Sequence, residues 1–163
     1  MLKTFLYIHI AIWIVFLLLG KAYSREQLIA ANFLAEKNII NNWSKTPPRY
    51  KFNGHIWLVD TLNMSLSLWN IKKNQNCRWD FIDSLSSYNM ELCRTFETSK
   101  DAGIFDPKDK KISPLQSINH KEFTDIMFKR DDIQDTYYPL DSQESITRGE
   151  AFVRIYQFLN DRK

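Results

Sequence analysis

The spacing of apolar residues along the chain predicts five α-helices after an apolar N-terminal stretch. Within each predicted helix the apolar side chains recur every three or four residues, as they do on one face of an α-helix. The predicted helices cover roughly residues 25–38, 54–71, 86–102, 118–128 and 147–159. The loops between them are polar, and the sequence offers few candidate strands. We therefore predict an all-α fold of helix pairs with long connecting loops.

Two of these helices open on the same polar signature. Thr147 precedes the last helix with Glu150 three residues later, and Asn119 and Glu122 have the same relation in the fourth helix. This spacing is the capping-box pattern. Arg148 follows in the first turn of the last helix. A cation there interacts unfavourably with the helix dipole, but together with free N–H groups it favours the binding of an anion. The pattern predicts an anion site, with an ordinary surface cation beside a cap as the alternative.

Residues 1–24 have the layout of a secretory signal peptide. Lys3 gives a basic start, residues 5–19 are almost wholly apolar, and Ala22 and Ser24 have cleavage-site spacing. A retained membrane anchor is the alternative, although the apolar run is short against the ~20 residues that span a bilayer. We expect a secreted protein of the cell envelope or cell surface. It would contact a membrane only if this segment is retained.

Cleavage would leave a nearly neutral domain at residues 25–163. The chain has 22 Lys and Arg against 19 Asp and Glu, and the leader holds two of the basic residues and none of the acidic ones, which leaves +1. This balance gives no reason to expect nucleic acid as a partner. The remaining length is enough for one domain with a hydrophobic core.

The mature chain contains two cysteines, Cys77 and Cys93. An even count in an exported protein favours a disulfide, worth ~3 kcal/mol for a loop of this size. Two buried free thiols are the alternative. No further cysteine or histidine completes the spacing of a zinc site.

Catalysis finds little support in the sequence. No nucleophile, base and orienting group can be assembled from the spacing of the residues. The two histidines of the mature chain, His55 and His120, are too scattered from acidic residues to indicate a metal site. We therefore predict a non-catalytic protein without a metal or cofactor.

Two segments share a motif around their helix starts. Residues 102–106 read Ala-Gly-Ile-Phe-Asp and lead through Ile-Ser-Pro at 112–114 to Ile-Asn-His-Lys-Glu-Phe at 118–123, while Ile-Thr-Arg-Gly-Glu-Ala occupies 146–151. These segments resemble the S-layer homology repeat. In that family a helix ends in Gly-Ile, and a loop with Phe-x-Pro leads to a second helix that opens with Ile-Thr-Arg-Ala-Glu-Phe. The last copy departs from the family pattern at Gly149 and Ala151.

A weaker first copy is found near residue 38. Asn38 stands in place of the glycine, and both residue types tolerate left-handed geometry. His55 lies as many residues after Asn38 as His120 lies after Gly103. We therefore expect His55 and His120 to occupy the position of Arg148, with a chance alignment of His55 as the alternative. The repeats would cover roughly residues 25–71, 78–130 and 136–163.

The resemblance implies three repeats around a pseudo-threefold axis, with the second helix of each facing the middle. The third copy has no room for a first helix between Lys129 and Tyr138, which leaves five helices. In the family the motif arginines line grooves between repeats and bind anionic cell-wall polysaccharide.

The resemblance therefore implies a glycan site at these helix starts. Its predicted residues are Arg148, Thr147, Glu150, His120, Asn119 and His55. The histidines would be the weaker cations at neutral pH. The implied partner is a cell-wall polysaccharide, and the alternative is an envelope protein bound by a scaffold that has lost its glycan site.

Overall fold

The structure is a computed structural model of the chain, and it describes residues 23–40, 50–75, 77, 90–107, 113–129 and 143–162. The predicted signal segment up to residue 22 lies outside them, as does the stretch 130–142, where the third repeat is predicted to lack a first helix. The described residues form five α-helices and isolated β-bridges without a sheet, which confirms the all-α prediction. None of these helices has the length and apolar character needed to cross a membrane.

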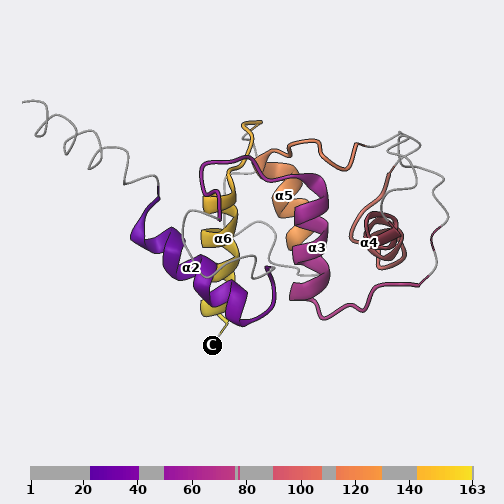
Figure 1. Cartoon of the computed structure of the whole chain (residues 1–163), viewed down its shortest axis with the longest axis horizontal. Coiled ribbons are helices and arrows are strands. Elements are labelled where there is room, and N and C mark those ends of the chain that lie inside the picture. The colour runs from indigo at the N-terminus through magenta and orange to yellow at the C-terminus, as the bar shows by residue number, and fades with distance from the viewer. Residues whose placement is uncertain are drawn as a thin grey trace, which may run out of the picture.

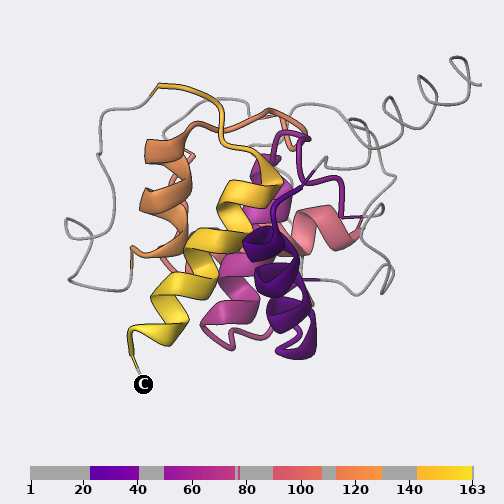
Figure 2. The same cartoon turned by 90° about the vertical axis from the view of Figure 1, so that its left-hand side faces the viewer.

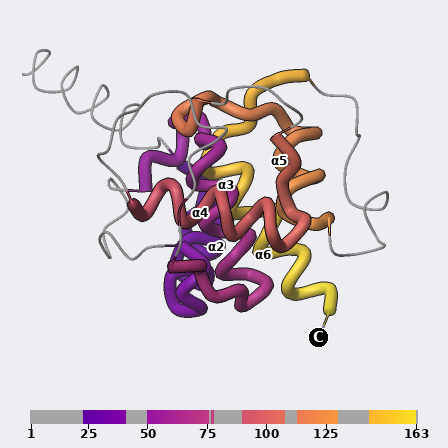
Figure 3. The backbone as a smooth tube through the Cα atoms, turned by 90° about the vertical axis from the view of Figure 1, so that its right-hand side faces the viewer, coloured from indigo at the N-terminus to yellow at the C-terminus, as the bar shows by residue number. Residues whose placement is uncertain are grey.

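The helices are stacked along the long axis of the molecule. Their bounds are Arg25–Glu36 for α2, Leu58–Leu68 for α3, Met90–Asp101 for α4, His120–Met127 for α5 and Arg148–Asn160 for α6. Figure 1 shows α2 and α6 at one end, α3 and α5 in the middle and α4 at the other end. α2 packs against α6 (Figure 2), and α3 packs against both α5 and α4 (Figure 3).

Three helices end in the same left-handed turn. Asn38, Asn70 and Gly103 have φ values of 56°, 52° and 68°. An isoleucine follows each of them, and its N–H donates back to a carbonyl in the helix at 2.8–2.9 Å. This is the hydrogen-bond pattern of the Schellman motif. Asn38 therefore adopts the left-handed conformation that the sequence predicts for it.

The starts of α3, α5 and α6 meet in a closed ring of three backbone hydrogen bonds. Ile56 N–H donates to the Ile146 carbonyl (3.1 Å), Ile146 N–H to the Ile118 carbonyl (3.1 Å), and Ile118 N–H to the Ile56 carbonyl (3.4 Å). All three isoleucine side chains are buried. Figure 1 shows all three helices beginning on the same side of the molecule, at the top of the view. We call this contact the isoleucine ring.

The isoleucine ring defines which residues of the three helices are equivalent. The residue after each isoleucine is the N-cap, and the next residue begins the helix. The first helical residues are Leu58, His120 and Arg148. Their N–H groups donate to the carbonyls of Gln116, Glu144 and Gly54, respectively, at 3.0, 3.1 and 2.8 Å. Each helix start is thus satisfied by the loop that precedes another member of the ring.

The register of the ring shows that the predicted position of His55 is wrong. His55 stands before Ile56, and it forms a β-bridge with the N-cap Thr147. The residue equivalent to His120 and Arg148 is Leu58, which is buried. The count from the left-handed turn fails because the loop between Asn38 and α3 is longer than the loop between Gly103 and α5.

Cys77 and Cys93 form a disulfide, with their Cα atoms 5.5 Å apart. This is the pairing that the sequence favours over two free thiols. Cys93 lies in α4 and is fully buried, while Cys77 follows the extended segment that leaves α3. The disulfide therefore ties α4 to the chain that follows α3.

We expect the double variant Cys77→Ser/Cys93→Ala to have an unfolding free energy about 3 kcal/mol below that of the wild type, because the cross-link no longer restrains the unfolded chain. Urea unfolding followed by circular dichroism measures this. Dithiothreitol should lower the stability of the wild type and leave the variant unchanged. A variant as stable as the oxidised wild type would contradict the expectation.

Candidate functional site

Arg148, the strongest candidate from the sequence, is not a free surface cation. Its Nη2 donates to Asp60 Oδ2 at 2.7 Å, and its guanidinium lies 5.5 Å from the ring centre of Trp57. Only 15% of its side chain is exposed. The pair joins the start of α6 to the start of α3, so it is an interaction between two of the predicted repeats.

Asp60 is available for this pair because α3 lacks a side-chain cap. In α5 and α6 the third helical residue is a glutamate that closes a capping box with the N-cap, as the sequence predicts for Asn119 and Thr147. In α3 the N-cap is Trp57, whose side chain makes no capping hydrogen bond. Asp60 occupies the third position there, and its carboxylate turns to Arg148 instead.

The N–H groups at the start of α6 are also engaged. Arg148 N–H donates to the Gly54 carbonyl (2.8 Å) and Gly149 N–H to the Phe52 carbonyl (2.9 Å). Glu150 N–H donates to Thr147 Oγ1 at 3.3 Å. The prediction that free N–H groups here help to bind an anion is therefore wrong, because the loop before α3 already accepts from them.

Thr147, Glu150 and Asn119 act in the structure as capping residues. Glu150 Oε2 accepts from the N–H and from the Oγ1 of Thr147, at 2.8 and 2.7 Å. These hydrogen bonds hold the pKa of Glu150 below its usual value, although burial opposes them. Asn119 Oδ1 accepts from Glu122 N–H at 2.8 Å. These side chains stabilise helix starts that present Arg148 and His120.

His120 occupies the same position in α5 as Arg148 does in α6. His120 interacts electrostatically with Glu150, much as Arg148 interacts with Asp60. It also interacts electrostatically with Glu144 and Arg154. Burial lowers the pKa of the imidazole from 6.5, and Arg154 lowers it further, while the two glutamates oppose this. His120 Nδ1 is buried without a hydrogen bond to any described residue. Burial of His120 therefore favours the neutral imidazole over the imidazolium.

Gly149 departs from the alanine of the resembled family for a steric reason. A Cβ at this position would lie 2.7 Å from Cδ of Gln27 and 3.2 Å from the Phe52 carbonyl oxygen. Gln27 cannot simply move away, because its Oε1 accepts from Ser24 N–H (2.8 Å) in the capping box of α2. The glycine permits α2 to pack closely on α6.

A pocket of about 480 Å³ opens beside the pair of Arg148 and Asp60. Trp57 lies at this end of the pocket with 40% of its surface exposed, which is unusual for so large an apolar residue. The apolar part of the lining includes Ile39 and Ile40, which follow α2, Val59 and Met64 of α3, Leu92 of α4 and Phe152 of α6. A volume of this size is typical of small-molecule sites.

The pattern of apolar residues in the sequence does not reveal this pocket. The spacing of Trp57 from other apolar residues is helical. The pattern therefore predicts that it lies on the apolar face of a helix that packs into the core. In the structure it is the N-cap of α3, outside the helix, and its ring faces Arg148. Only its place at the start of the helix, as the N-cap, distinguishes Trp57 from the buried apolar residues of α3.

No group of three or more His, Cys, Asp or Glu side chains within the described ranges is arranged to hold a metal ion. Scans against protein-family models and against curated protein sequences find no match to this chain. The geometry of the pocket and of the helix starts is therefore the basis for a functional proposal.

We expect the protein to lose stability as the pH falls below 6.5, and His120→Gln to reduce this loss. The folded state lowers the pKa of His120, so the unfolded chain binds a proton first as the pH falls. Protonation therefore stabilises the unfolded state relative to the folded state in acid. Urea unfolding at about pH 7.5 and pH 5.5, either side of the unperturbed imidazole pKa, measures the difference.

The matched control for this comparison is His55→Gln, because His55 is exposed and lies at another junction of the ring. It should keep the pH dependence of the wild type. An unchanged pH dependence in His120→Gln would show that the burial of the imidazole does not affect stability.

Proposed function

We propose that the protein is an exported, non-catalytic glycan-binding module that attaches to the cell envelope. The observation that carries this proposal is the pocket in which an exposed tryptophan, Trp57, lies beside the paired groups of Arg148 and Asp60. Aromatic rings and planar polar groups are suited to sugars, since one face of a sugar ring is apolar while its edge carries hydroxyl groups.

The isoleucine ring supports the link to the S-layer homology repeat. The resemblance implies second helices that face the middle of the molecule, and the contact among the starts of α3, α5 and α6 supports this arrangement. The pocket lies where the start of α6 meets α3, and this position supports a glycan groove between the proposed repeats. The N-terminal segment, which has the pattern of a signal peptide, supplies the export that this function requires.

A second candidate function is an envelope protein–protein interaction module on a scaffold that has lost its glycan site. The observation that favours it is the charge and pairing of the side chains at the first residue of α3, α5 and α6. Arg148 is engaged by Asp60, partial burial lowers the pKa of His120 and disfavours its charged form, and Leu58 carries no charge. A scaffold without a free cation at these positions has lost the group that binds acidic glycans in the resembled family.

Co-sedimentation with purified cell-wall sacculi separates the two functions. We expect the wild type to sediment, and Trp57→Ala to weaken binding about tenfold, as the loss of ~1.4 kcal/mol of contact free energy implies. Arg148→Ala should weaken it as well, but it also leaves Asp60 without its partner. Thermal unfolding followed by circular dichroism is therefore recorded for both variants.

Ile29→Ala is the matched control, because Ile29 is also a large exposed apolar residue (44%) but lies on α2 outside the pocket. It should bind like the wild type. If neither the wild type nor any variant sediments with sacculi, the glycan proposal is wrong and the interaction module is favoured.

A further inference from the structure

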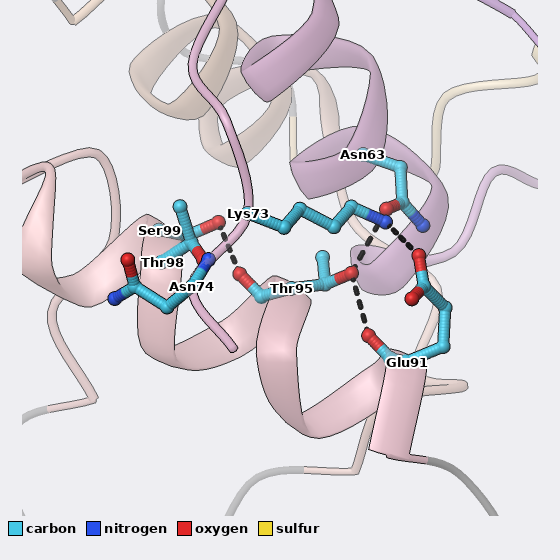
Figure 4. A network of polar contacts seen from close by, with 7 residues as sticks. All are labelled: Asn63, Lys73, Asn74, Glu91, Thr95, Thr98 and Ser99. Carbon is cyan, nitrogen blue, oxygen red and sulfur yellow. Dashed lines mark hydrogen bonds and ion pairs between the residues drawn. The ribbon is translucent and has the colours of Figure 1, made fainter. Parts of the chain in front are cut away.

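The pocket extends from Trp57 along one face of α3 to a second polar group of residues. The α3 residues that line it include Asp60, Asn63, Met64 and Ser67, which share one side of the helix. This stretch of helix is about 10 Å long, at 1.5 Å per residue. The opposite wall includes Lys73 and, from α4, Glu91 and Thr95. Figure 4 shows Asn63, Lys73 and Glu91 gathered at this end.

Both cations of the pocket are paired with a carboxylate of the protein. Arg148 pairs with Asp60 at 2.7 Å, and Lys73 forms an ion pair with Glu91. An acidic ligand that approaches either cation also meets the neighbouring carboxylate, which repels it. The lining therefore offers no unbalanced positive charge to an acidic ligand.

The same pairs suit a neutral, hydroxyl-rich ligand. Each pair presents N–H donors beside a carboxylate acceptor, and a sugar hydroxyl group can both donate and accept. Two adjacent hydroxyls can therefore contact a donor and an acceptor at once. Hydrogen bonds to charged groups are also stronger than those between neutral groups.

Asn63 adds a neutral amide between the two pairs. Its Oδ1 lies 2.9 Å from Thr95 Oγ1, and Thr95 is buried, so one end of the amide is fixed against α4. Its Nδ2 makes no hydrogen bond to any described residue, and the side chain lines the pocket. An amide held in this way presents donors to a hydroxyl or carbonyl oxygen of a ligand.

We propose that the pocket takes an uncharged segment of a polysaccharide, with one sugar unit at Trp57 and the Arg148–Asp60 pair and another at Asn63 and the Lys73–Glu91 pair. This rests on the glycan-binding function proposed above. The family resemblance implies an acidic polysaccharide, whereas the proposed ligand is neutral. The proposed ligand is also at least two sugar units long. The length of the α3 wall and the pocket volume accommodate such a segment.

The first test is the salt dependence of binding to purified sacculi. Between about 0.05 M and 0.5 M NaCl, binding of a neutral segment should change by less than about twofold, because screening acts on charge. Sedimentation that falls about tenfold or more over this range would identify an acidic ligand and overturn the proposal. That result leaves the glycan-binding function intact, whereas a lack of sedimentation at both salt concentrations overturns both.

The second test removes the balancing carboxylate at the Trp57 end. Asp60→Asn leaves the Arg148 guanidinium as an unpaired cation in the pocket. We expect this variant to bind sacculi with a new salt dependence, because it can now recruit acidic groups of the wall. If Asp60→Asn keeps the salt-independent binding of the wild type, charge balance does not select the ligand and the proposal is wrong.

The third test examines the second subsite. Lys73→Met and Asn63→Ala should each weaken binding about tenfold, as expected for the loss of one hydrogen bond to a buried ligand group. The matched control is Lys121→Met, which breaks the exposed pair of Lys121 and Asp125 (3.6 Å) on α5 outside the pocket. If Trp57→Ala weakens binding while Lys73→Met and Asn63→Ala do not, the ligand occupies one subsite and the two-unit proposal is overturned.

Discussion

The closed ring of hydrogen bonds among Ile56, Ile118 and Ile146 is the contact on which the rest of the described structure depends. The three segments form only isolated bridges, so each finds its backbone partner in the other two. The ring places the first turn of each helix against the loop that precedes another. It thereby satisfies the N–H groups that a helix start would otherwise present to solvent or to a ligand.

The ring also decides which charged groups meet. It brings the first helical residue of one helix of the ring next to the third helical residue of another. Arg148 pairs with Asp60 in this way, and His120 lies in the field of Glu150. Where the N-cap side chain makes no capping hydrogen bond, as in α3, the third residue is available to a neighbouring helix. The loss of a cap at Trp57 therefore both engages Arg148 and exposes an aromatic ring at the pocket.

Local features of the fold could be predicted from the sequence, and contacts between distant residues could not. The capping boxes at Asn119 and Thr147 join residues three positions apart, and the left-handed turn at Asn38 depends on one residue type. The partner of Arg148 is 88 positions away, and no local pattern encodes it. The position predicted for His55 is wrong because it depends on the length of a loop, which the repeat pattern does not constrain.

Amide hydrogen exchange at the three isoleucines of the ring tests most directly whether it is a single structural unit. If Ile56, Ile118 and Ile146 are held by one closed ring, their amides should exchange with the same opening free energy, equal to that of global unfolding. Added denaturant should lower this free energy equally for all three. Exchange of any one of these amides through a local opening, at a much lower free energy than the other two, would contradict the account.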